Sequence, residues 1–344
     1  MTHLTQASRE LFSRSPDQWF ESLASLAGYC QQKRDAAVER WHPPFDLVPQ
    51  PSGDGRLELS LSLGSDGAFS LNEWSFGQVC RLAGVPKGTV NRLTAETGSR
   101  VLRETLPGGA KPLQLLTEET QVRAVHAASY TRLYNAELVE VLQEFDGDFS
   151  PPPPGFNGAT GLYAGEQDVF CFLVDPDGWI DVDGEAFAPG FFAFNSEVGR
   201  RSLGVSTFWY QKICGNHIVW DVADVCCLTR KHTANVRDAL DDIRRMIEGL
   251  VARRDEQKDE FAGLVGRAMH MKLGNDAEEV DKALRQNGLP PALAKQTVES
   301  VPPWQDWTVF AAVDALTRNA RSERNAGSRL EADRRAASLL TLAV

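Results

Sequence analysis

The chain of 344 residues lacks several features that would assign a protein to a class directly. No apolar run approaches the roughly 18 residues needed to cross a bilayer, so no membrane partner is predicted. The first ten residues hold no basic segment followed by an apolar core, which predicts no secretory leader. Six cysteines are present without any CxxC pair, as is typical of reduced thiols. We therefore expect a cytoplasmic protein.

Basic residues are missing from one long segment. The chain carries 36 Lys plus Arg and 47 Asp plus Glu, for a formal net charge of −11. No Lys or Arg occurs between Arg132 and Arg200, yet thirteen acidic residues lie there, from Glu137 to Glu197. A uniformly basic surface that coats nucleic acid is therefore excluded. Any nucleic-acid site must be local, and Arg200 with Arg201 provides the first cations after the acidic segment.

Motifs of nucleotide binding and catalysis are also missing. The sequence holds no phosphate loop, dinucleotide-binding glycine run, HExxH or nucleophile elbow, so we expect no cofactor and favour a protein that is not an enzyme. Cys214, His217, Cys227 and His232 have the spacing C-x2-H-x9-C-x4-H, and these ligand types suit zinc. Buried thiols beside a hydrogen-bonded histidine explain the same residues. A metalloprotein or an enzyme centred on Glu197, Cys214, His217 and His232 stays an alternative.

The apolar patterns divide the chain into three regions. They predict a mainly helical segment over 1–110, an α+β core over 111–232 and helices over 233–344. The predicted fold is α+β, with a central, mostly antiparallel sheet, an N-terminal helical segment and a C-terminal helical region.

Individual elements follow from periodicity and capping signals. Ser15 begins an apparent capping box, which predicts a helix to about Arg40. Alternation over 203–213 predicts a strand with one buried face. The other predicted strands are 56–63, 120–127, 160–164, 169–174, 179–182 and 187–195, and the other predicted helices lie at about 71–106, 135–145, 236–251, 257–273, 276–287, 291–300, 306–320 and 328–342.

Residues 76–93 fit a helix-turn-helix. Cys80 is small enough for two helices to cross, Gly84 suits the turn, and apolar residues mark a shared core. A DNA-binding function would place four polar residues in a major groove: Lys87, Thr89, Asn91 and Arg92. A plain pair of packed helices explains the same pattern.

Three stretches, 127–139, 187–217 and 307–318, carry a family resemblance. On them the chain resembles the phage- and plasmid-type proteins known as domain of unknown function nine hundred thirty-two, over roughly residues 70–325. The specific positions are Asn195, Ser196, Glu197, Gly199, Cys214, Asn216 and His232. The resemblance implies a mobile-element protein, in the host cytoplasm if a phage encodes it, and brings no agreed catalytic residues. Asn195 to Gly199 would form a ligand or subunit contact, or only cap a turn between strands.

The leading hypothesis is a nucleic-acid-handling protein. The predicted element order over 120–250 is similar to that of single-strand annealing proteins, so we expect a homo-oligomer that binds single-stranded DNA or RNA. The expected contacts are Arg200, Arg201, Lys212, Arg230 and Lys231, with Trp209 and Tyr210 stacking on bases. Two further alternatives remain: a helix-turn-helix regulator, and an acidic host-interaction protein.

Overall fold

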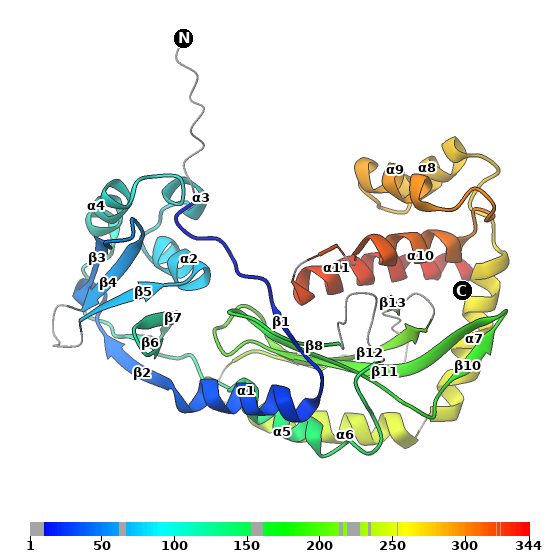
Figure 1. Cartoon of the computed structure of the whole chain (residues 1–344), viewed down its shortest axis with the longest axis horizontal. Coiled ribbons are helices and arrows are strands. Elements are labelled where there is room, and N and C mark those ends of the chain that lie inside the picture. Colours follow the sequence, from blue (N-terminus) through cyan, green and yellow to red (C-terminus); the bar gives the residue numbers. More distant parts are fainter. Residues whose placement is uncertain are drawn as a thin grey trace, which may run out of the picture.

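A computed structural model describes residues 10–61, 67–152, 161–212, 216–218, 228–232, 235–252, 254–320, 322–323 and 325–344. The fold is α+β, as predicted, and its strands form two sheets. We call the six-stranded sheet with its helices the first lobe and the eight-stranded sheet with its helices the second lobe (Figure 1). No helix in the described ranges combines the length and the apolarity needed to span a membrane.

The first lobe packs three helices on one sheet. The strand pairs are antiparallel except for one parallel pair, β5 with β7. Leucines of the strands and the apolar stripes of α2 and α4 form one core. The sheet order is β2 (Ala37–His42), β6 (Leu113–Glu118), β7 (Gln121–Ala127), β5 (Ala68–Leu71), β4 (Leu57–Leu61) and β3 (Leu47–Pro51), and the helices are α2 (Glu73–Leu82), α3 (Lys87–Val90) and α4 (Ala95–Thr105).

The second lobe is built on an antiparallel sheet whose long central strands are rich in phenylalanine. A short strand, β10 (Ile180–Val182), pairs with β11, and another, β14 (Leu228–Arg230), pairs with β12. The main order is β1 (Gln18–Phe20), β8 (Leu162–Ala164), β9 (Val169–Val174), β11 (Glu185–Asn195), β12 (Leu203–Gln211) and β13 (Asn216–Ile218).

Helices cover both faces of this second sheet (Figure 1). Leu203 and Val205 of β12 pack with the helices of one face, whereas Phe208 and Tyr210 pack under α11 on the other. The prediction of a single buried face for this strand is therefore wrong, because its even positions are also covered. One face carries α1 (Leu23–Asp35), α5 (Asn135–Gln143) and α6 (Asp238–Ala252); the other carries α10 (Val309–Ala320) and α11 (Ala326–Ala337); α7 (Arg254–His270), α8 (Ala277–Gln286), α9 (Pro291–Ser300) and the 3-10 helix η2 (Ser338–Ala343) lie at the far end.

The N-terminal region differs most from the sequence prediction. The capping box lies at Ser22 and Ser25 rather than at Ser15, and the segment predicted as one helix forms β1, α1 and β2. Within the described ranges, the residues before 111 form five strands as well as four α-helices. The predicted boundary at 110/111 falls inside one sheet, because β6 and β7 pair with strands that precede it. The strand β2 was missed because it forms only through pairing with β6, some 75 residues later.

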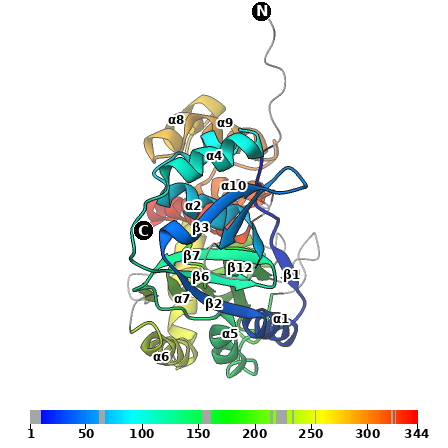
Figure 2. The ribbon, with the colours of Figure 1, turned by 90° about the vertical axis from the view of Figure 1, so that its left-hand side faces the viewer.

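The chain passes between the lobes three times. Leu11 and Phe12 pack in the core of the first lobe, and the chain then enters the second lobe as β1 and α1. It returns for β2 to β7 and leaves again for α5. Figure 2 shows the first lobe in front, with α1 and α5 beneath it.

Candidate functional site

The block Asn195–Gly199, which carries part of the family resemblance, lies at the contact between the lobes. It begins at the last residue of β11, and Val198 packs on apolar residues of β6 and β7. Asn195 and Ser196 are fully buried, and Glu197 is 2% exposed. Polar side chains are costly in such a place unless they are hydrogen-bonded, so their partners define what the block does.

The carboxylate of Glu197 forms hydrogen bonds with residues of both lobes. Its Oε1 accepts a hydrogen bond from Nη2 of Arg123 on β7 at 2.5 Å. Its Oε2 accepts the backbone N–H of Asn135, the first residue of α5, at 3.1 Å. A carboxylate at a helix N-terminus also complements the helix dipole. The Glu197 side chain therefore joins the first sheet to a helix of the second lobe.

Arg132 holds the same block from the segment before α5. Its Nη1 donates to the backbone carbonyl of Glu197, its Nε to Oε1 of Glu39 at 2.9 Å, and its Nη2 to Oε1 of Gln114 at 3.2 Å. Gln114 in turn donates from Nε2 to Oε2 of Glu39 at 2.9 Å. The buried guanidinium is thus fixed in one orientation by acceptors on three elements.

Asn195 and Ser196 complete the block with bonds to the second lobe. Nδ2 of Asn195 donates to the carbonyl of Leu133 and to Oδ1 of Asn135, both at 2.9 Å. Oγ of Ser196 donates to the carbonyl of Gln167 at 2.6 Å and accepts the backbone N–H of Arg200 at 2.8 Å. Of the two interpretations of this block, these bonds favour the structural one.

Three aromatic rings stack beside the block. The rings of His126 and Tyr130 are 3.8 Å apart and nearly parallel, and His232 stacks on Tyr130 at 5.2 Å. Burial lowers the pKa of His126 to about 3, aided by the nearby Arg132 charge, and burial lowers the pKa of His232 to about 4. Both histidines are therefore neutral at physiological pH.

Gly199 closes over this stack. Its φ is +75°, a conformation that favours glycine, and a Cβ there would lie 2.8 Å from Cε1 of His126. Only glycine fits without displacing the histidine ring.

We expect the stacked histidines to make the protein acid-sensitive. Because their pKa values are lowered in the folded state, the unfolded state binds more protons as pH falls below about 6.5. Each histidine should then lower the free energy of unfolding by about 2 kcal/mol when the pH falls from 7 to 5. Guanidinium unfolding at both pH values would measure this loss.

The matched variants are His126→Phe and His270→Gln. His126→Phe keeps a ring beside Tyr130 but binds no proton, so it should remove about half of the histidine-dependent loss. His270 is exposed, and His270→Gln should leave the loss unchanged. An undiminished loss in His126→Phe would contradict the assignment.

A second buried carboxylate, Asp168, ties the N-terminal segment to the second sheet. It accepts from Nη2 of Arg14 and from Nε of Arg201, each at 2.9 Å. Arg14 also donates to Asp17 at 3.0 Å, and Asp17 accepts the backbone N–H of Ala326, the first residue of α11, at 2.8 Å. Burial raises the pKa of Asp17. Arg201, predicted to contact nucleic acid, is thus engaged in holding the fold.

The third feature is a small cationic pocket on α2, which we call the Trp74 surface. Nε1 of Trp74 donates to the carbonyl of Val198 at 2.7 Å, which fixes the indole at the lobe contact. The guanidinium carbons of Arg81 and Arg200 lie 6.0 and 5.9 Å from its ring centre. In the described part of the chain, neither arginine makes an ion pair. The pocket has a volume of about 260 Å³ and is lined by Trp74, Gly77, Arg81, Val85 and Lys87.

Two predicted stacking residues are corrected by the structure. Trp209 is buried against Phe261 of α7, with the rings parallel at 4.0 Å, and Tyr210 is buried in the core under α11 near Trp179. Neither ring has a free face for a base. They are buried because helices cover both faces of β12.

The predicted cations do not form one surface. Arg200 and Lys212 are both exposed, but they flank opposite ends of β12, whose nine residues span about 30 Å. Lys231 is exposed and follows β14, which pairs with the start of β12 near Arg200. The side chain of Arg230 is outside the part of the chain that the structure describes.

The predicted helix-turn-helix forms α2 and α3. However, α3 has only four residues. Asn91 is buried: its Oδ1 accepts the backbone N–H of Phe12, and its Nδ2 donates to the backbone carbonyl of Phe12, both at 2.8 Å. Asn91 therefore cannot read bases, contrary to the hypothesis. Lys87 pairs with Glu73, Arg92 donates to the carbonyl of Gly88, and Thr89 is exposed.

The proposed metal cluster falls mostly on parts that are not described. Cys214 and Cys227 lie outside the described residues, and only the backbone of Asn216 and His217, in β13, is described. Within the described ranges, no group of three His, Cys, Asp or Glu is placed to hold a metal ion. The zinc alternative stays a prediction.

Arginines elsewhere in the chain neutralise part of the acidic segment 133–199. Glu137 and Glu144 of α5 and its cap pair with Arg237 and Arg244 at 3.1 and 2.7 Å. Asp168 and Glu197 are the buried carboxylates described above. These four carboxylates are therefore not free to form the solvated acidic face that a host-interaction protein would need.

The pocket residue Trp74 was missed because no motif includes it. The available signal was an aromatic residue in the first turn of a helix, away from the apolar stripe of Phe76, Val79 and Cys80. Comparison with known proteins adds nothing to the geometry: no family model, no curated protein and no solved structure matches this chain. The family resemblance stays a prediction.

Proposed function

We propose that this chain binds nucleic acid on the Trp74 surface, with single strands preferred to duplexes. The observation that carries the proposal is a fixed indole beside two guanidinium groups that make no ion pair within the described ranges. Arg81 and Arg200 provide charges for neighbouring phosphates, and the part of the Trp74 side chain that lines the pocket contacts an unpaired base. A homo-oligomer would extend this surface along a strand, as expected of an annealing-type protein.

Single strands are favoured because duplex reading needs a protruding helix. A recognition helix enters the major groove, but α3 is a single turn, and Asn91 at its C-cap is buried in hydrogen bonds to Phe12. A pocket of about 260 Å³ beside a tryptophan suits a base that has left the stack. The helix-turn-helix regulator is therefore the weaker proposal.

Fluorescence anisotropy with labelled single- and double-stranded DNA and RNA at low salt tests the proposal. We expect Arg81→Ala/Arg200→Ala to bind single strands about tenfold more weakly. Its slope of log affinity against log salt should fall by about 1.4, since each lost phosphate contact removes about 0.7. Size-exclusion chromatography with light scattering on the same protein would measure the oligomeric state.

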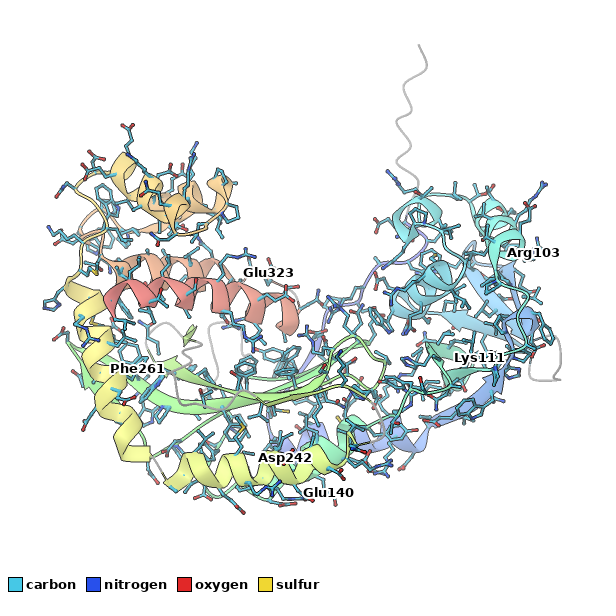
Figure 3. The ribbon with its side chains drawn as sticks, turned by 180° about the vertical axis from the view of Figure 1, so that it is seen from behind. Arg103, Lys111, Glu140, Asp242, Phe261 and Glu323 are labelled. Carbon is cyan, nitrogen blue, oxygen red and sulfur yellow. The ribbon has the colours of Figure 1, made fainter. Side chains whose placement is uncertain are left out.

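The matched control removes two other exposed cations, Arg103 and Lys111. Figure 3 shows both on the outer side of the first lobe, away from the second sheet. Arg103→Ala/Lys111→Ala changes net charge equally and should bind as the unmodified protein does. Equal losses in both double variants, or no binding at micromolar protein and low salt, would overturn the proposal.

A further inference from the structure

A second pocket opens beside the lobe contact, and none of its lining residues belongs to the Trp74 surface. It lies between the edge strand β2 and the segment that leads into α5, with a volume of about 340 Å³. This size is within the range of small-ligand sites. Its principal walls are Glu39, Trp41, Tyr130, Arg132, Tyr134 and Arg237.

The aromatic wall leaves one ring free. Tyr130 is stacked between neighbours, and the guanidinium of Arg34 lies 5.5 Å from the ring centre of Tyr134. Trp41, in contrast, is 51% exposed, and no ring contact involves it within the described ranges. A half-exposed indole at the wall of a pocket is a stacking platform for a planar ligand.

The polar wall favours a ligand with negative charge and an amino group. Two arginines and one glutamate line the pocket, which gives a net charge of +1. Arg132 is held by three acceptors, whereas Arg237 is exposed and, among the described residues, bonds only to Glu137, through its Nε at 3.1 Å. Glu39 is one-third exposed, so its carboxylate can accept a further hydrogen bond from the ligand.

We propose that this pocket binds a nucleotide. The base stacks on Trp41, its exocyclic amino group donates to Glu39, and the phosphate contacts Arg237. Two ligands carry these groups: a free mononucleotide and one nucleotide unit of a single strand. The inference goes beyond the proposed function, because it needs neither Arg81 nor Arg200.

Calorimetric titration with AMP, UMP and a short oligo(dA) separates these sources. AMP carries an exocyclic amino group and UMP does not, so AMP should bind more tightly. Trp41→Ala should weaken AMP binding about tenfold, since it removes the stacking ring. If AMP does not bind but Trp41→Ala weakens oligo(dA) binding about tenfold, the ligand is a unit of a strand.

The control is Trp304→Ala, which removes a tryptophan that is 86% exposed elsewhere and should change nothing. Arg81→Ala/Arg200→Ala should keep AMP binding, so the two proposals can fail separately. Thermal unfolding checks that Trp41→Ala is folded, and Trp41→Phe should recover part of the affinity. The inference is overturned if neither AMP nor oligo(dA) binds, or if Trp41→Ala binds AMP and oligo(dA) as the unmodified protein does.

Discussion

Replacing Glu197 by alanine should lower the free energy of unfolding by about 3–5 kcal/mol, which is the range for removing one partner of a buried ion pair. The loss comes from leaving the guanidinium of Arg123 buried with Glu118 as its remaining acidic partner in the described part of the chain, at 3.4 Å from Oε2 to Nε. The backbone N–H of Asn135 also loses its acceptor. Urea unfolding followed by circular dichroism would measure the change.

Two variants separate charge from packing in this result. Glu140 is an exposed glutamate on α5 (Figure 3), and Glu140→Ala should cost less than about 0.5 kcal/mol. Arg123→Met/Glu197→Leu removes both charges and should be more stable than Glu197→Ala alone. A Glu197→Ala protein as stable as Glu140→Ala would show that this carboxylate does not hold the lobes.

Asp168→Ala should have the next largest effect, about 2–4 kcal/mol, because one buried carboxylate neutralises two arginines. The arginine side chains keep some contact with solvent, which places the loss below that of Glu197. The segment around Arg14 should also detach, since Asp168 and Asp17 are its anchors. Limited trypsin digestion should then cut after Arg14 at least tenfold faster.

The control for this variant is Asp146→Ala, at an exposed position after α5. It makes the same chemical change without a buried partner and should alter neither stability nor the digestion rate. Unchanged cleavage after Arg14 in Asp168→Ala would mean that other contacts, such as those of Leu11 and Phe12, secure this segment.

Much of the second lobe could be predicted from its sequence. The strands β9, β11 and β12 are continuous apolar or alternating runs, and α8 to α10 begin near clear proline or acidic signals. The edge strands β2 and β3 could not be predicted in this way. Both are short, β3 contains two prolines although its partner β4 follows directly, and the partner of β2 lies some 75 residues later in the sequence.

The candidate site was predicted in part. The residues Asn195 to Gly199 stood out by their pattern, but their partners Arg123 and Arg132 lie 74 and 65 positions from Glu197. No local signal connects residues so far apart, so a ligand contact and a structural junction could not be distinguished. Arg200 was predicted as a contact residue, whereas the indole beside it was not.

The three passages of the chain between the lobes affect how the protein is synthesised. The strand β1 ends at Phe20, but its partner β8 begins at Leu162. At about 5–20 residues per second, a ribosome needs roughly 7–30 seconds to produce that partner. During this interval β1 and α1 have no sheet to pack on, whereas β2 to β7 can already pair with one another. The elements β1 and α1 are thus made well before the sheet that holds them, and are secured later than the strands of the first lobe.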